Sequence, residues 1–224
     1  MRRPLPLVVV LLAIAAAIAI GVGEDAPPAA PREVALPAPV TKGTVSLEEA
    51  LSRRRSVRAY ESKALTQQQL GQLLWAMQGI TDPATGHRTA PSAMARYPLT
   101  VYVFNADGVF TYQPQGHKLI TVSDKDQRPD LAGVSQRSVG QAAVTFVITG
   151  DPSKLGARAA ARAQQFMTLE VGHVAQNLAL QAVALGLGSV PIGGFDPAAV
   201  AKLLNLPESQ AVIYLLPVGY PAAG

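Results

Sequence analysis

The most informative stretch of the sequence spans residues 169–188 and reads LEVGHVAQNLALQAVALGLG. Apolar residues occupy most faces of a helix drawn through it. One polar stripe interrupts them at spacings of three and four, and it consists of Glu170, His173, Asn177 and Gln181. The pattern predicts one long helix, from near Ser153 with room for a break to Leu185, ended by the glycines at 186 and 188. So apolar a helix must be buried, against a sheet or against a partner subunit.

Helix signals recur on both sides of this segment. Ser46 with Glu49 has the spacing of a capping box and predicts a short helix over 47–54. Thr66 predicts the start of a second helix, closed by Gly79. Asp196 and Pro197 supply the cap and first-turn proline of a short helix that ends at residue 204.

Strand signals lie between the helices. The segments 99–104 and 109–112 read as a hairpin around the turn NADG, and the apolar runs 143–149 and 211–218 read as buried strands. Residues 80–98 form a predicted loop rich in Gly, Pro, Ser and Thr. The order of elements is not a regular βαβ repeat, so we expect an α+β fold with three α-β-α layers around a mostly antiparallel sheet.

Composition narrows the class of function. Of the 224 residues 49% are hydrophobic and 15% charged, which is enough apolar material for a packed core. The net charge of +4 is spread thinly, so nucleic-acid binding is not expected. With no cysteine and three histidines at unrelated spacings, a metal centre is not expected either.

The N-terminal residues have the pattern of a targeting signal; the alternative is an internal hydrophobic core helix, against which the lack of an amphipathic pattern speaks. Arg2 and Arg3 precede an apolar run from Leu5 to Val22, which predicts a hydrophobic helix that acts as a signal peptide or membrane anchor over 1–23. Residues 24–45 are rich in Pro and Ala and predict an extended linker, which leaves 46–224 as the catalytic or binding domain. The domain is therefore expected to be exported, in the periplasm or anchored to the membrane.

Three segments could contact a ligand. In an extended chain, Arg54, Ser56 and Arg58 point the same way and suit a phosphate or polyol; the alternative is a solvated basic helix end. The small residues of RTAPSA at 88–93 would let a flat ligand approach, although many surface loops look alike. The glycines of PIGG at 191–194 could present backbone N–H groups to a ring, or form an ordinary turn. Nucleophile-elbow, Rossmann and P-loop motifs are absent from the sequence.

Taken together, these segments resemble the nitroreductase family, and within it the branch of azoline-oxidising dehydrogenases that form thiazoles and oxazoles. The matching segments, in order, are RRSVRAY at 54–60, LLWAMQGI at 73–80, RTAPSA at 88–93, LEVGHVAQNL at 169–178, LGLG at 185–188 and LPVG at 216–219. The resemblance runs from about Ser46 to the C-terminus.

The resemblance implies an intertwined homodimer with FMN at the subunit interface. NADH or NADPH would reduce the flavin, which would pass electrons to a nitro compound, a quinone or a similar acceptor, so that no acid or base residue is required and none is assigned a catalytic role. The polar stripe of the long helix is expected to be structural. The implied cofactor-binding residues are Arg54, Ser56 and Arg58 at the phosphate, Arg55 near the ring edge, Pro91, Ser92 and Ala93 over the partner's flavin, and Pro191, Ile192, Gly193 and Gly194 at the ring.

Three differences from the family pattern limit which family properties can be expected of this chain. No Lys precedes a Tyr, so the Lys-Tyr pair that the azole-forming branch uses for proton removal is missing. Tyr220 stands where an arginine often follows the terminal glycine, so one phosphate contact is lost. An exported location would also separate the domain from cytoplasmic NADPH. The alternative reading is a module at the membrane that binds or senses flavin with little or no turnover.

Overall fold

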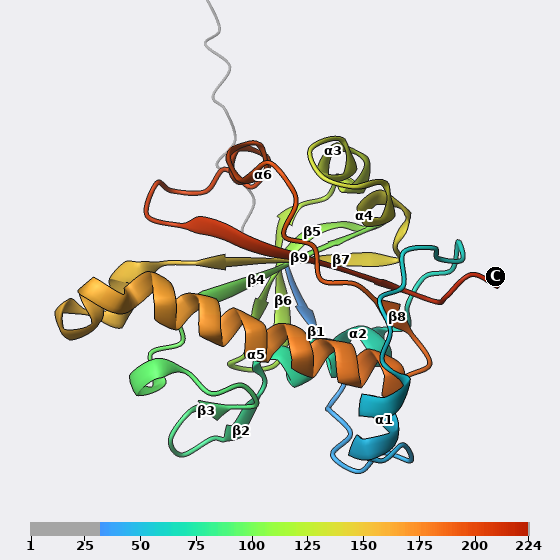
Figure 1. The fold of residues 1–224 in the computed structure, drawn as a ribbon, viewed down its shortest axis with the longest axis horizontal. Coiled ribbons are helices and arrows are strands. Elements are labelled where there is room, and N and C mark those ends of the chain that lie inside the picture. Colours follow the sequence, from blue (N-terminus) through green and yellow to red (C-terminus); the bar gives the residue numbers. More distant parts are fainter. Residues whose placement is uncertain (1–31, 224) are drawn as a thin grey trace, which may run out of the picture. The chain divides into compact units, whose positions relative to one another are not determined.

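The computed structural model describes residues 32–223, which form a seven-stranded sheet in the order β1-β6-β5-β4-β7-β9-β8 (Figure 1). All neighbouring strands run antiparallel. The strands are β1 (Glu33–Ala35), β4 (Leu99–Asn105), β5 (Gly108–Gln113), β6 (Lys118–Ser123), β7 (Val144–Gly150), β8 (Gly188–Ser189) and β9 (Ala211–Gly219). A separate hairpin consists of β2 (Ile80–Asp82) and β3 (His87–Arg88). The expected antiparallel sheet is confirmed.

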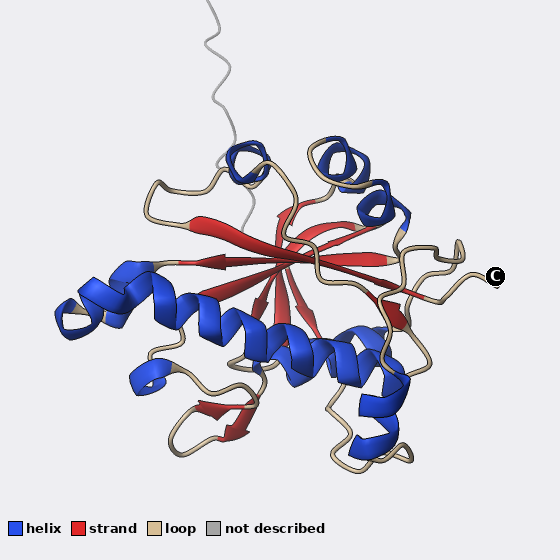
Figure 2. Ribbon diagram, in the orientation of Figure 1, coloured by secondary structure: helices blue, strands red, loops and turns tan. Residues whose placement is uncertain are grey.

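Helices cover both faces of the sheet (Figure 2). On one face lie α1 (Leu47–Arg53), α2 (Gln67–Gln78) and α5 (Ala163–Ala184), and on the other α3 (Arg128–Gly133), α4 (Arg137–Gln141) and α6 (Pro197–Leu203). Short 3-10 helices are η1 (Ala93–Ala95), η2 (Pro152–Leu155) and η3 (Ala157–Arg162). These are the three layers of an α+β fold.

Strand alternation gives the sheet two apolar cores. Every residue of β7 is buried. Phe146 packs with α2 and α5, while its neighbour Val147 packs with α3 and α6 on the opposite face. A strand buried on both faces must be apolar throughout, which is why this segment could be recognised in the sequence.

The predicted helix caps are present. The Ser46 hydroxyl accepts a hydrogen bond from the Glu49 N–H at 3.1 Å, and Thr66 forms the full capping box with Gln69. Asp196 accepts from the N–H groups of Ala198 and Ala199, both at 3.0 Å. Each cap satisfies N–H groups that would otherwise be orphaned at the helix start and contributes about 1 kcal/mol.

The long helix is shorter than its apolar pattern suggests. α5 has 22 residues and begins at Ala163, because the segment from Ser153 is divided into η2 and η3 by Gly156, whose φ is 77°. Three members of its polar stripe make internal contacts. Glu170 accepts from the Gln78 amide at 3.4 Å, Asn177 donates to the Thr89 carbonyl at 3.4 Å and Gln181 accepts from Gln72 at 3.2 Å. That part of the stripe is structural, as expected.

Several elements differ from the expectations. β1 lies inside the segment 24–45 that was predicted to be a linker, and it pairs with β6 as the edge strand of the sheet. The predicted loop 80–98 contains the β2–β3 hairpin and η1. β6, α3 and α4 had no strong local signal, and all three are six residues or shorter. Such short elements form because the rest of the domain packs against them.

The predicted N-terminal hydrophobic helix, residues 1–23, lies outside the described residues. Among residues 32–223, no helix is long and apolar enough to cross a membrane.

Candidate functional site

The first candidate segment, the arginine strap (residues 54–58), begins where α1 ends. The Arg54 N–H still donates to the Ala50 carbonyl at 3.0 Å, but its ψ of 120° turns the chain into an extended course. Val57 packs against Gly188, where a Cβ atom would lie only 2.7 Å from it. Because side chains alternate along an extended chain, the exposed Ser56 and Arg58 point away from this contact.

The strap carries cations without acidic partners. Arg53, one residue earlier, pairs with Glu49 at 2.6 Å. Arg54, Arg55 and Arg58 make no ion pair within residues 32–223. Arg55 folds back and donates to the carbonyls of Ser52 at 2.9 Å and Arg54 at 2.8 Å, so it closes the end of α1 in the single subunit. Arg54 and Arg58 remain available to an anionic ligand.

The second segment, the glycine turn (residues 191–194), is fixed by β9. The Ile192 N–H donates to the Leu215 carbonyl at 2.8 Å and the Leu215 N–H donates back at 3.1 Å. A Cβ atom at Gly193 or Gly194 would meet no atom of the domain closer than 3.8 or 3.6 Å, and neither glycine has a positive φ. The subunit therefore does not need glycine at either position. Their lack of side chains leaves a surface that a flat ligand can approach.

Strap and turn are neighbours. Ser56 pairs with Ser189 in a parallel bridge, and the Val57 N–H donates to the Ser189 carbonyl at 3.0 Å. Tyr60 holds the far end of the strap, because its hydroxyl lies 2.6 Å from the Val57 carbonyl and 3.2 Å from that of Pro217. Burial of this phenol raises its pKa, so it remains a neutral donor. The structure thus brings two of the three predicted segments together.

The third segment, the proline loop (residues 91–97), has a strained backbone. Met94, Ala95 and Tyr97 have φ values of 54°, 51° and 48°, which non-glycine residues seldom adopt. The Ser92 hydroxyl accepts the Tyr97 N–H at 2.9 Å and helps to hold this conformation. Strain of this kind persists where surrounding contacts impose it and is concentrated at functional sites.

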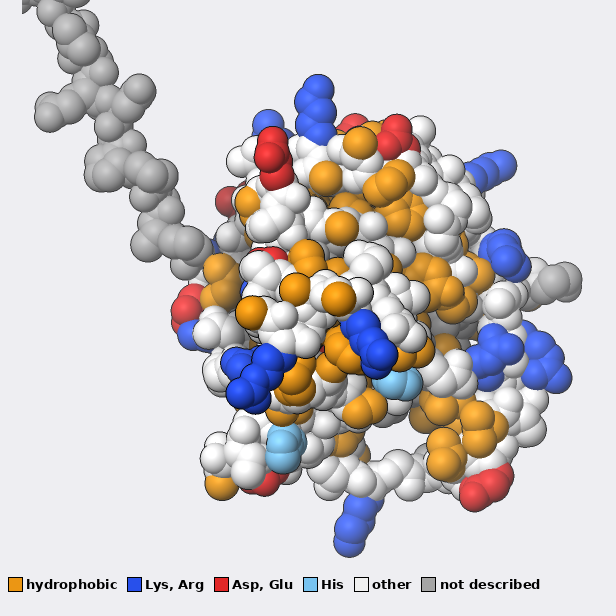
Figure 3. Space-filling view, turned by 60° about the vertical axis from the view of Figure 1, so that its left-hand side comes forward, with side chains coloured by type: hydrophobic (Ala, Val, Ile, Leu, Met, Phe, Trp, Pro, Cys, Tyr) orange, Lys and Arg blue, Asp and Glu red, His pale blue; other side chains and the backbone are white. Residues whose placement is uncertain are grey.

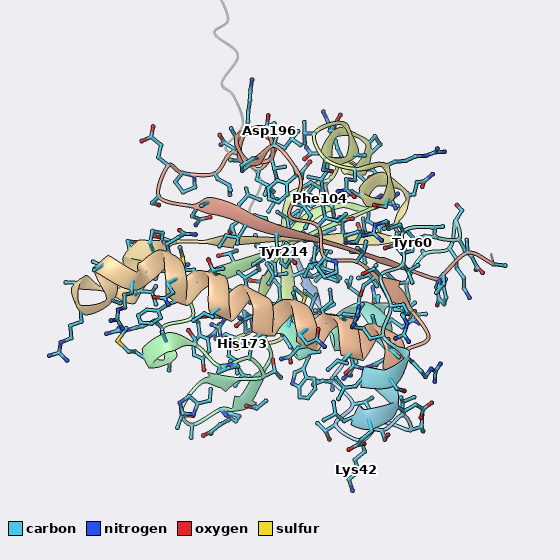
Figure 4. The ribbon with its side chains drawn as sticks, in the orientation of Figure 1. Lys42, Tyr60, Phe104, His173, Asp196 and Tyr214 are labelled. Atoms are coloured by element: carbon cyan, nitrogen blue, oxygen red, sulfur yellow. The ribbon has the colours of Figure 1, made fainter. Side chains whose placement is uncertain are left out.

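The proline loop lies against α5, where Pro91, Ser92 and Ala93 border a cavity of about 260 Å³ next to Leu169, Glu170 and His173. Figure 4 shows His173 midway along α5, on the side away from the sheet, and Tyr60 toward the C-terminal end of the helix. Glu170 is only 2% exposed, and burial raises the pKa of its carboxyl, with hydrogen bonds from Ser92 and Gln78 opposing this shift. Its Oε2 atom has no hydrogen-bond partner among the described residues.

The proline loop does not meet the strap within one subunit. The strap borders Val183 of α5, whereas the loop borders Glu170. At a rise of 1.5 Å per residue these positions are about 20 Å apart along the helix. A ligand contacted by all three segments therefore requires the loop of a second copy of the chain.

Sequence patterns missed the residues that support the loop. Arg88 donates to the Gln78 side chain at 3.0 Å and stacks on the Tyr97 ring at 4.3 Å, and the Tyr97 hydroxyl accepts the Arg88 N–H at 3.1 Å. These contacts join residues of α2, β3 and the proline loop, so no local spacing in the sequence predicts them. Tyr220, at the position of the expected arginine, donates to Gln69 of α2 at 2.9 Å.

Comparison with known proteins decides the family. The sequence profile of the nitroreductase family matches residues 51–220. The chain belongs to the nitroreductase family. A protein of Methanocaldococcus jannaschii described as a nitroreductase is 36% identical over 183 residues, which cover 78% of this chain and 91% of that protein.

Other similarities extend this result. The crystal structure of a nitroreductase-family protein from Ralstonia eutropha is similar with a TM-score of 0.80 and 29% identity, over 86% of this chain and 91% of that one. A Bacillus subtilis protein named FMN reductase [NAD(P)H] is 28% identical over 193 residues, which cover 78% of this chain and 65% of that protein. The chain is an oxidoreductase enzyme of this family with a flavin cofactor, FMN.

The residues present fit FMN. Arg54 and Arg58 have no acidic partner in the described part of the chain, as a phosphate-binding pair requires. Gly193 and Gly194 leave an open surface on the segment that follows Ser189, the residue that pairs with the strap. No group of three or more metal-ligating side chains lies together within residues 32–223.

Proposed function

We propose that FMN lies between two subunits, held by the arginine strap and the glycine turn of one and by the proline loop of the other. The observation that carries this proposal is the separation of about 20 Å between Glu170 and Val183 along α5. Because one subunit cannot bring its own loop to its own strap, the site needs a homodimer.

The outer face of α5 supports this arrangement. Leu169 is 54% exposed, and Gly172 is exposed in the middle of the helix with no atom within 4 Å of the position that a Cβ would occupy. A mid-helix glycine costs about 1 kcal/mol relative to alanine, and no side chain of residues 32–223 occupies the space beside it. Close approach of another helix would give this glycine a role. In Figure 3, where the N-terminal end of α5 is turned forward, hydrophobic and basic side chains lie side by side and acidic ones lie mostly toward the edges.

A two-fold axis near Gln176 would bring the three segments together. Gln176 is exposed and lies midway between Glu170 and Val183. In an antiparallel pair of α5 helices related by this axis, the Glu170 region of one subunit lies beside the Val183 region of the other. Each proline loop would then cover the strap and turn of the partner, which gives two equivalent sites per dimer.

Each segment has a defined task at the site. Arg54, Ser56 and Arg58 hold the phosphate, because two guanidinium forks and a hydroxyl supply charged and neutral donors. Gly193 and Gly194 let the ring approach the backbone, whose N–H groups can stabilise negative charge on it. When bound, FMN accepts a hydride and passes electrons on, so the protein has to orient it and leave one face open.

For the substrates we propose NADH or NADPH as donor and an electron-poor nitro compound or quinone as acceptor. The motifs resemble those of the azoline-oxidising branch, but without a Lys-Tyr pair azoline oxidation lacks its proton acceptor. We further propose that residues 1–23 export the domain or anchor it at the membrane, on the pattern of Arg2 and Arg3 before an uncharged apolar run.

The test is the colour and redox response of the full-length chain purified in a mild detergent. A yellow protein that is bleached anaerobically by NADH or NADPH and regains its colour with menadione or nitrofurazone supports the enzyme. A yellow protein that neither nucleotide bleaches supports the alternative, a flavin-binding module. A folded, colourless protein that does not take up added FMN contradicts both.

A further inference from the structure

A second cavity, of about 320 Å³, lies where the β2–β3 hairpin meets the ends of β4 and β5. Two cations border it, Arg88 of β3 and Lys154 of η2, and no aspartate or glutamate does. The rest of its lining combines the apolar residues Leu99, Val101 and Ile120 with the polar residues Thr100, Thr111 and Gln113. Neither the arginine strap nor the glycine turn takes part in it.

Arg88 is placed to bind an anion. Its Nη1 donates to Gln78 at 3.0 Å, but its Nε is buried and has no partner among the described residues. No carboxylate of residues 32–223 pairs with it within 4.0 Å. The carboxylate whose charge acts on the pKa of Arg88 is that of Glu170. The Gln78 amide lies between the two side chains and hydrogen bonds to both. Burial lowers the pKa of Arg88, because a guanidinium removed from water without a counter-ion is held at a cost.

Two further donors face the same cavity. The Tyr97 hydroxyl accepts the Arg88 N–H at 3.1 Å, and its own proton has no acceptor in the described part of the chain. Lys154 is exposed and makes no ion pair there. The Tyr112 hydroxyl, by contrast, is engaged with His117 Nδ1 at 2.9 Å. Arg88, Tyr97 and Lys154 are therefore the groups that a bound anion would meet.

We propose that this cavity binds a small organic carboxylate, whose charged end meets Arg88, Lys154 and Tyr97 while an apolar or aromatic body lies against Leu99, Val101 and Ile120. A guanidinium fork matches the two oxygens of a carboxylate. The apolar wall favours such a molecule over inorganic phosphate. Because Arg88 closely precedes the proline loop, carboxylate-bearing electron acceptors become the first substrates to examine, an extension that rests on the proposed function.

Binding by isothermal titration calorimetry tests the site without any need for turnover. The probes are benzoate, its neutral counterpart benzamide and inorganic phosphate, each titrated into the full-length protein. We expect benzoate to bind, and benzamide to bind at least about tenfold more weakly, because benzamide offers Arg88 and Lys154 no negative charge. Phosphate should also bind at least about tenfold more weakly, because it has no apolar body to contact Leu99, Val101 and Ile120. Equal affinity for benzoate and benzamide, or tighter binding of phosphate, overturns the proposal.

Two variants locate the binding. Arg88→Gln and Lys154→Gln should each weaken benzoate, whereas Arg158→Gln, which removes an exposed cation from the neighbouring η3, should not. Lys154 is exposed, so its variant remains informative even where loss of Arg88 disturbs the loop. Benzoate affinity that is unchanged in Lys154→Gln, or equally reduced in Arg158→Gln, contradicts the assignment. Benzoate binding at this cavity does not depend on bound flavin. The carboxylate proposal and the proposed FMN site can therefore fail independently.

Discussion

The backbone N–H of Val57 donates to the Ser189 carbonyl at 3.0 Å, and this contact joins two segments that lie more than a hundred residues apart in the sequence. On the strap side it leaves Ser56 and Arg58 exposed, and on the other it leads into the glycine turn. The strap and the segment that enters the glycine turn are thereby held next to each other within one subunit. Such preorganisation lowers the entropy that cofactor binding must overcome.

Glycine substitutions around this contact should separate folding from flavin binding. A Cβ at Gly188 would lie 2.7 Å from Val57, so Gly188→Ala should lower the free energy of unfolding by about 1–3 kcal/mol. Gly193→Ala and Gly194→Ala meet only ordinary contacts at 3.8 and 3.6 Å and should leave stability unchanged. They should nevertheless weaken FMN binding, measured by fluorescence titration of the flavin. Unchanged flavin affinity in both would exclude the turn from the site.

Gly172 should control the oligomeric state. Replacement by arginine places a long charged side chain on the exposed face of α5, and we expect a monomer that does not retain FMN. Gly133, equally open at the end of α3 on the other face of the sheet, is the matched control, and Gly133→Arg should remain a dimer with flavin. Light scattering coupled to size-exclusion chromatography measures the mass. A dimeric Gly172→Arg variant would rule out the antiparallel α5 pair.

Glu170 should make stability depend on pH. Burial raises the pKa of its carboxyl in the folded chain above the ordinary value of 4.5, so the folded state binds this proton more tightly than the unfolded state does. The stability that protonated Glu170 contributes is fully present below pH 4.5, and it is lost as pH rises through the raised pKa. Glu170→Gln cannot ionise and should avoid this loss.

Urea unfolding at a series of pH values measures the effect. From pH 4.5 upward, the free energy of unfolding of Glu170→Gln should increase relative to the parent protein. Glu208→Gln, which removes an exposed carboxyl beyond α6, controls for the loss of one acid from the chain. A difference for Glu170→Gln that does not change with pH would mean that burial does not perturb its ionisation.

Much of the fold could be predicted because its signals are local. The caps at Ser46, Thr66 and Asp196 depend on residues two or three positions away, and the buried strand β7 is apolar along its whole length. That Arg54, Ser56 and Arg58 point the same way was predicted on the condition that the strap is extended, and the backbone after α1 meets that condition. Its proximity to the glycine turn was expected only through the family resemblance, because the bridge between Ser56 and Ser189 joins distant segments.

What could not be predicted depends on contacts between distant segments. β1 has only three residues, in a region rich in proline, and exists because β6 offers an unpaired edge. The network of Gln78, Arg88 and Glu170 joins α2, β3 and α5, and each of these residues alone has an ordinary sequence context. The division of labour between two subunits was expected only through the family resemblance, because no local sequence pattern predicts where the strap and the loop lie along α5.

The most direct measurement is the flavin content of the double variant Arg54→Ala/Arg58→Ala, purified as the full-length chain. We expect a folded dimer with the parent circular dichroism spectrum and almost no bound FMN, while Arg53→Ala, which removes only the cation paired with Glu49, should keep its flavin. A double variant that still copurifies with one FMN per subunit would show that the phosphate is held elsewhere and would contradict the site described for this family member.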